Sequence, residues 1–219
     1  MGRAKRPSAR GAKQRQTTRS QSVGPASHYP GELRIIGGIW RSRRLTVPLS
    51  AGLRPTPNRV RETLFNWLQP YVPGASCLDL FSGTGALCLE ALSRGAGSVV
   101  MVEQAALAAA ALKNNVAVLG AERAQVIHAD ALAFLADRGL PGKNCAPSFD
   151  IIFIDPPFRS ELIERCVKLI STHGWLNPGG LVYVEAPRNF GNLELPSTWE
   201  IIRSKTTGRV GYHLARNRL

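Results

Sequence analysis

The most specific chemical signal in the sequence is an apolar run, residues 149–154, that leads into Asp155, Pro156, Pro157 and Phe158. Two successive prolines remove two N–H donors, which leaves backbone carbonyls as acceptors without competing donors. Acceptors at the Asp155 carboxylate and the Pro156 carbonyl would localise the lone pair of an exocyclic base amine, and Phe158 would stack on an extruded base. The motif therefore predicts a catalytic site for a base amine. The alternative is a strand that stops at a loop with a core Phe.

A second candidate site follows an apolar run that ends at Asp79, where a tight turn containing Gly83 and Gly85 opens a helix. Glycines allow a ligand to approach the backbone closely, and ligands of open α/β sheets bind outside the carboxyl ends of strands. A dinucleotide fingerprint would have a third glycine where Cys88 stands, and an Asp in the loop would repel a pyrophosphate. The loop therefore favours a cationic ligand, such as a sulfonium amino acid.

Two further carboxylates follow apolar runs. Glu103 lies 24 residues after Asp79 and could accept the hydroxyls of a ribose, or be an ordinary solvated residue at a helix start. Asp130, which precedes Ala131, could accept an adenine amino group, cap the helix that begins at Ala131, or do both.

The net charge of the 219-residue chain is +13, and the excess is concentrated near its start. Residues 1–30 contain seven of the 28 Lys and Arg and no acid, and seven more lie between Arg34 and Arg61. Such a field attracts polyanions, most commonly nucleic acid, although a solvated, solubilising tail would look the same. Residues 1–30 also lack large apolar side chains, which predicts a disordered basic tail.

Several classes of protein are excluded or disfavoured. No apolar run approaches the roughly 18 to 20 residues that a membrane span needs. The four cysteines form no C-x-x-C pair and have no His at zinc-ligand spacing, so we expect no metal and reduced thiols in a cytoplasmic protein. The chain has no P-loop and no G-x-S-x-G nucleophile motif.

The positions of the apolar runs predict the elements that must hold these residues. Alternation of strands with helices indicates an α/β fold with a mostly parallel sheet, and two final strands without a helix between them indicate an antiparallel edge hairpin. Strands are expected at 76–81, 98–103, 124–128, 149–154, 180–185, 199–206 and 209–216. Helices are expected at 86–94, 104–118, 130–137 and 160–172.

The residues before this domain predict a small extension. Residues 33–47 look like a small β element with a turn signal at Gly37-Gly38, and residues 58–69 look like a helix that Asn58 or Thr56 can cap. We therefore divide the chain into a basic tail (1–30), an RNA-binding extension (31–74) and a cofactor-binding domain (75–219).

The order of these motifs resembles class I S-adenosylmethionine-dependent methyltransferases with a Rossmann-like sheet. Asp155-Pro-Pro-Phe158 is the mark of those that methylate amines. The stretches Leu33–Gly38, Leu53–Leu68 and Leu89–Gly95 are similar to those of the RsmD family of bacterial 16S rRNA guanine-N2 methyltransferases. The resemblance covers roughly residues 33–219. It departs at Asn58, where the family usually has Asp, and this puts in doubt any role that needs a charge there.

This resemblance implies S-adenosylmethionine as cofactor and N2-methylation of one guanine of 16S rRNA (nucleotide 966 in the usual rRNA numbering). The substrate would be an assembled small ribosomal subunit and the enzyme a cytoplasmic monomer. The implied cofactor residues are Asp79, Phe81, Gly83, Gly85, Glu103, Asp130 and Ala131. The implied catalytic residues are Asp155, Pro156, Pro157 and Phe158. Arg54, Thr56, Arg59 and Arg61 would face RNA.

Two other functions use the same motifs. An adenine-N6 methyltransferase acting on DNA or another RNA would need the same Asp-Pro-Pro-Phe chemistry. A nucleic-acid-binding protein could keep the fold without turnover, although the intact Gly83, Gly85 and Asp155 argue against it. A nicotinamide-dependent oxidoreductase is disfavoured by Cys88 and by Asp79 in the loop.

Overall fold

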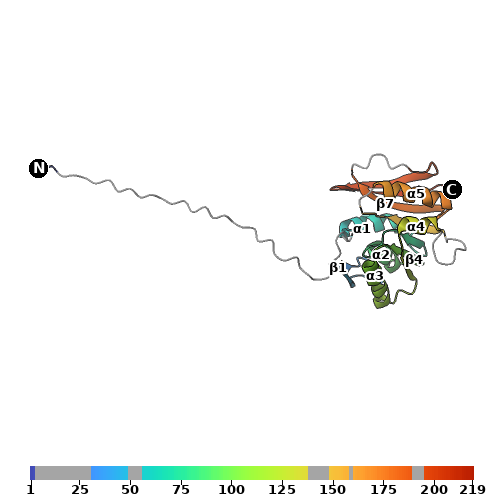
Figure 1. Ribbon diagram of the computed structural model, residues 1–219, viewed down its shortest axis with the longest axis horizontal. Helices are drawn as coiled ribbons and strands as arrows, with labels where there is room; N and C mark the ends of the chain where they lie inside the picture. The colour runs from blue at the N-terminus through green and yellow to red at the C-terminus, as the bar shows by residue number, and fades with distance from the viewer. Residues whose placement is uncertain (3–30, 49–55, 138–147, 158–159, 189–194) are drawn as a thin grey trace.

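A seven-stranded sheet forms the centre of the protein in the computed structural model (Figure 1). The structure describes residues 1–2, 31–48, 56–137, 148–157, 160–188 and 195–219. The strand order is β5-β4-β3-β6-β7-β9-β8, with β3 to β7 parallel and β8 and β9 antiparallel at one edge, which confirms the predicted sheet. The strands are β3 (Ser76–Asp79), β4 (Ser98–Glu103), β5 (Ala124–His128), β6 (Phe149–Ile154), β7 (Leu176–Pro187), β8 (Trp199–Thr207) and β9 (Val210–Asn217).

Helices cover both faces of the sheet, and all five expected helices are confirmed. They are α1 (Asn58–Leu68), α2 (Ala86–Ser93), α3 (Ala106–Leu119), α4 (Ala131–Ala136) and α5 (Ser160–His173). Because successive strand residues point to opposite faces, β6 divides its side chains between two cores. Ile151 and Phe153 pack with α1, α2 and α3, whereas Ile152 and Ile154 pack with α4 and α5.

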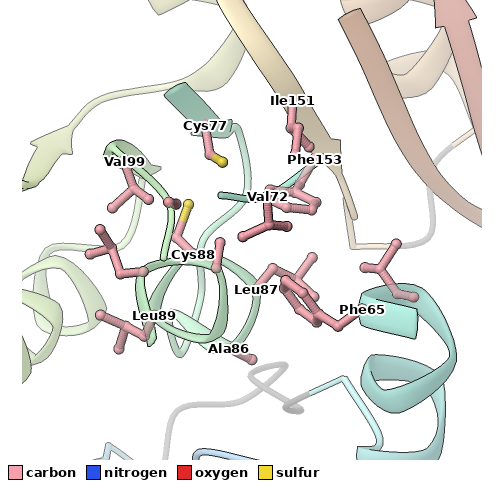
Figure 2. Packing of buried hydrophobic residues seen from close by; sticks show 14 of the residues in the cluster. Phe65, Val72, Cys77, Ala86, Leu87, Cys88, Leu89, Val99, Ile151 and Phe153 are labelled. Carbon is pink, nitrogen blue, oxygen red and sulfur yellow. The ribbon is translucent and has the colours of Figure 1, made fainter. Parts of the chain in front are cut away.

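The core on the α2 face joins elements from distant parts of the sequence. Figure 2 shows Phe65 of α1, Leu87 of α2 and Phe153 of β6 pointing toward one another. The rings of Phe65 and Phe153 lie 6.4 Å apart between centroids. Since Phe153 lies two residues before Asp155, this packing helps fix the end of the strand that delivers the predicted catalytic acid.

The extension contains a two-stranded antiparallel sheet, β1 (Gly31–Arg34) and β2 (Arg44–Val47), as expected. β2 of this sheet contacts α3. Leu33 and Ile35 are 1% exposed and belong to the α2-face core. The extension is therefore packed as part of the main hydrophobic core.

Polar contacts also fasten the extension to α2. The buried carboxylate of Glu90 accepts hydrogen bonds from the backbone N–H groups of Ile36 and Gly37, each at 2.8 Å. Ser93 Oγ accepts from Trp40 N–H at 3.0 Å. A Cβ atom at Gly38 would lie 1.7 Å from the Ser93 carbonyl oxygen, so this close approach requires glycine.

The start of α1 differs from the expectation. Pro57 occupies the N-cap position and no side chain in the described part of the protein caps the helix, so the prediction that Asn58 or Thr56 caps it is wrong. Asn58 Oδ1 instead accepts a hydrogen bond from Arg61 Nη2 at 2.7 Å, and Thr56 Oγ1 donates to Asp155.

Within the described ranges, no helix has the length and apolar character that a membrane crossing requires.

Candidate active site

Asp79 and Asp155 lie at the ends of the two central strands of the sheet. Asp79 ends β3 and Asp155 follows β6, and these strands pair in parallel with Asp79 opposite Phe153. The strand order reverses direction between β3 and β6, and such a switch point is where open α/β sheets bind ligands. The fold therefore brings the predicted cofactor loop and the predicted amine site to the same edge.

The loop after β3 has the backbone that its glycines predict. Gly83 and Gly85 have φ angles of 48° and 79°, in the left-handed region that favours glycine. A Cβ atom at Gly85 would lie 2.6 Å from Leu112 Cδ2, so a side chain there would also displace a buried leucine of α3. Phe81 N–H donates to Asp79 Oδ1 at 3.2 Å, which folds the loop back over the carboxylate.

Glu103 is bound to this loop. Its Oε2 accepts from Gly83 N–H at 2.8 Å, and its Oε1 accepts from Ala105 N–H at 2.7 Å. Each carboxylate oxygen has a second lone pair, so both can still accept ribose hydroxyls. The ribose role of Glu103 stays a prediction, but the alternative of a merely solvated residue does not describe these contacts.

Asp130 caps α4, one of the two alternatives that the sequence left open. Its Oδ1 accepts from Leu132 N–H at 3.0 Å and from Ala133 N–H at 2.9 Å. The residue is exposed and follows β5 at the same edge as Glu103. Ala131 is buried at the start of the helix. Contact of Asp130 and Ala131 with an adenine remains a prediction.

Asp155 is held by a residue from the extension side of the chain. Thr56 Oγ1 donates to Asp155 Oδ2 at 3.2 Å, across a separation of 99 residues. Burial raises the pKa of Asp155 to about 6, against the lowering effect of this hydrogen bond. The carboxylate is therefore oriented by Thr56 and poorly solvated, which suits an acceptor that positions a reacting amine.

A fifth acid, Glu185 on β7, lies close to Asp155 and was not among the predicted site residues. It is 8% exposed, and burial, together with the charge of Asp155, raises its pKa to about 8. Tyr183 Oη donates to Glu185 Oε1 at 2.6 Å. The sequence did contain a signal for it, since Glu185 follows the buried run of residues 181–184 as Asp155 follows residues 149–154.

The site is acidic, and no cation of the described residues forms an ion pair with its acids Asp79, Glu103 and Asp155. Asp79 is 2% exposed, and burial raises its pKa to about 8, with the charges of Asp155 and Glu103 adding to the shift. An unpaired buried carboxylate is costly, so this edge of the sheet fits a positively charged ligand.

Comparison with known proteins agrees with this arrangement. A family model described as conserved hypothetical protein 95 matches residues 33–216. The chain is 46% identical over 184 residues to ribosomal RNA small subunit methyltransferase D of Escherichia coli strain K12, across 84% of this chain and 89% of that protein. The chain belongs to the ribosomal RNA small subunit methyltransferase D family.

Other members of the family and solved structures are similar over the same region. The Haemophilus influenzae methyltransferase D is 44% identical, across 85% of this chain and 95% of its own. The solved structure of the Escherichia coli protein yhhF has a TM-score of 0.78 and 43% identity, covering 85% of this chain and 98% of that one. Haemophilus influenzae HI0767 has a TM-score of 0.72 and 42% identity, covering 85% and 99%.

The four residues expected to face RNA in this family have different positions. Arg59 is exposed on α1, and its RNA contact remains a prediction. Arg61 is 1% exposed, so the expectation that it faces RNA is wrong: its charge lies 3.5 Å from Glu90 in the interior. Thr56 is buried and contacts Asp155. Arg54, like the predicted base-stacking residue Phe158, lies outside the described residues.

The methyltransferase D extension nevertheless has an exposed basic surface. The exposed cations on and around its two strands are Arg34, Arg41, Arg43 and Arg44. The sequence showed their charge but did not single them out, because exposure depends on which side of the hairpin packs against α2. This surface is a better candidate for phosphate contacts than Arg61.

Two cavities lie away from Asp155. One, of about 450 Å³, opens between residues 70–75 and 178–181 at the amino-terminal edge of the sheet, opposite the Asp155 edge. The other, of about 750 Å³, lies between α4 and α5 and includes Asp130 among its lining residues. The cavity at the amino-terminal edge is lined by no predicted site residue. The candidate active site is therefore the carboxyl edge of the sheet, where the acids lie together.

Proposed function

We propose that this protein is an S-adenosylmethionine-dependent methyltransferase that methylates the exocyclic N2 of a guanine in 16S ribosomal RNA. The family supports the class of reaction and the RNA, since its curated members at 44% and 46% identity are named ribosomal RNA small subunit methyltransferases. The observation that carries the proposal is the position of Asp155 beside the glycine loop at the switch point. The substrate is proposed to be the RNA within an assembled small subunit.

The residues at this edge fit the cofactor. Asp79 would accept the ammonium of its methionine part, Glu103 the ribose hydroxyls and Asp130 the adenine amine. S-adenosylmethionine supplies a methyl group on a positively charged sulfur, and the unpaired acidity around Asp79 favours that charge. Gly83 and Gly85 leave the backbone open to a close ligand.

The protein's own contribution to the reaction is positioning and electrostatics. The guanine amine would donate one N–H to the Asp155 carboxylate and the other to the Pro156 carbonyl, so that its lone pair points at the methyl group. The bound cofactor would supply the methyl group, its C–S bond breaking as the N–C bond forms, and the methylated nitrogen would then lose a proton to water or to Asp155. No covalent enzyme intermediate is needed, because the amine is itself the nucleophile.

The pKa of Asp79 predicts how cofactor binding depends on pH. The ionised carboxylate binds a cation, whereas the pKa of about 8 keeps Asp79 mostly protonated at neutral pH in the empty site. Cofactor affinity should therefore rise between about pH 6 and pH 7.5, by up to about tenfold per unit, with release of close to one proton. Calorimetry in two buffers of different ionisation enthalpy measures this proton.

The control for this prediction is Asp79→Asn, which cannot ionise. The variant should bind the cofactor more weakly, and the pH dependence should be lost over the same range. If the wild-type protein binds the cofactor equally well at about pH 6 and pH 7.5, without proton release, the role assigned to Asp79 is wrong.

The proposed function is tested by methyl transfer from labelled cofactor to small subunits purified from a strain that lacks this gene. The expected product is N2-methylguanosine at a single position of 16S RNA, identified by mass and chromatography of the nucleosides. Label in DNA, in another RNA or in N6-methyladenosine would overturn the substrate. Absence of transfer to any nucleic acid would favour a binding protein that keeps the fold.

A further inference from the structure

Glu185 and Asp155 occupy equivalent places on neighbouring strands. In the parallel pairing of β6 with β7, Ile154 lies opposite Val184, so each acid is the next residue along its strand. Two residues before each acid, on the same face of the sheet, lie Phe153 and Tyr183, whose rings are in edge contact at 6.3 Å between centroids. The two carboxylates therefore follow a fixed aromatic pair toward the same side of the sheet.

The surroundings of Glu185 hold it in place without neutralising it. Tyr183 donates to its Oε1 at 2.6 Å, and no other described residue donates to this carboxylate. No described cation forms an ion pair with it. Methyl transfer at Asp155 and Pro156 does not itself need Glu185. A buried acid beside another acid nevertheless lowers the stability of the folded protein, which points to a role for it.

We infer that Glu185 accepts the N1–H of the target guanine while Asp155 and Pro156 hold its N2 amine, and that this contact selects guanine over bases with an unprotonated N1. The inference rests on the proposed function and deepens it. It assigns Glu185 as a specificity-determining residue for the base.

The chemistry of the base edge supports this assignment. Guanine presents N1–H and N2–H₂ side by side, so two adjacent carboxylates meet two adjacent donors. Adenine presents a lone pair at N1 beside its amine, which an ionised Glu185 would repel. Charge-assisted hydrogen bonds of this kind are the strong ones, and a buried acceptor left without its donor is penalised.

The same contact would help the reaction. A carboxylate that accepts N1–H increases the electron density of the ring and so the nucleophilicity of N2. Donation from a protonated Glu185 to a ring nitrogen would withdraw density and oppose the transfer. Burial raises the pKa of Glu185 to about 8, and an incoming N1–H donor offsets the cost of the ionised form.

The test compares guanine with 2-aminopurine at the target position, in small subunits reconstituted from wild-type proteins and ligated 16S RNA. 2-Aminopurine keeps the reacting amine but has a lone pair at N1. Wild-type enzyme should methylate it with a kcat/KM at least about 100-fold lower than guanine. Glu185→Gln, whose amide can either accept or donate, should narrow this ratio to within about tenfold while its rate on guanine falls.

Controls separate specificity from structure and from the proposed function. Cofactor affinity of Glu185→Gln should match the wild-type value, and its unfolding midpoint should be no lower, because the substitution removes a buried acid that lies beside Asp155. If Glu185→Gln lowers both rates equally and leaves the ratio unchanged, or if the wild type methylates both bases equally, the role of Glu185 is refuted while the proposed function stands. If the wild type does not methylate guanine N2 in 16S RNA, the proposed function itself fails.

Discussion

Replacing Asp155 by alanine should lower methyl transfer by at least about 10²–10³-fold while the protein still binds the cofactor. The carboxylate is the acceptor that fixes the amine, and the substitution leaves the amine in its delocalised, unoriented form. Cofactor binding should persist because Asp79 and Glu103, on β3 and β4, make the proposed cofactor contacts. Single-turnover methyl transfer measures the first quantity and calorimetry the second.

The neighbouring hydroxyl provides a graded control. Thr56→Val removes the hydrogen bond to Asp155 Oδ2 but keeps the carboxylate, so transfer should fall by roughly tenfold, less than in Asp155→Ala. Unchanged turnover in Asp155→Ala would remove this residue from the mechanism. Loss of cofactor binding in the same variant would show instead that the substitution disturbs the glycine loop.

Replacing Glu90 by glutamine should destabilise the folded protein by about 3–5 kcal/mol, the largest effect on stability that we expect. Glu90 is fully buried and is shared by Arg94 at 2.7 Å and Arg61 at 3.5 Å. Arg61 Nε and Nη1 are buried and have no hydrogen-bond partner among the described residues, so the Arg61 charge depends on Glu90. Without the negative charge, two guanidinium groups would remain beside each other with no counter-ion, as urea unfolding would show.

Two variants serve as controls for Glu90. Glu32→Gln breaks an exposed ion pair with Arg44 and should cost less than about 1 kcal/mol. Asn58→Asp places a charge beside Arg61, and in the Glu90→Gln background it should recover part of the lost stability, because Asn58 already contacts Arg61. A cost for Glu90→Gln no greater than that of Glu32→Gln would contradict the buried network.

The elements could be predicted from the sequence because their signals are local. A buried strand that ends in an acid can be recognised at Asp79, Glu103 and Asp155, and the structure places all three at one edge. The same pattern ends the run before Glu185 and was overlooked, because neither a glycine loop nor a double proline directly follows it. Composition and spacing within a few residues were enough to predict the strands and the acids that end them.

The positions of Arg61 and Thr56 could not be predicted because they depend on distant partners. A row of arginines near a helix start looks like an RNA-binding surface, but the direction of each side chain depends on how α1 packs. Arg61 is buried because Glu90, on another helix, supplies its counter-charge. Thr56 is directed inward by Asp155, 99 residues away.

Helix α2 connects the two sites at which the ligands would meet the protein. Its first turn begins at Gly85 of the cofactor loop, and Glu90 and Ser93 near its other end fasten the extension. A shift of the extension on RNA would therefore move the loop, so the affinities for cofactor and RNA should be thermodynamically linked. Linkage is reciprocal: if bound RNA changes the affinity for the cofactor by some factor, bound cofactor must change the affinity for RNA by the same factor. The eight-residue helix α2 would then transmit the coupling between cofactor binding and RNA binding.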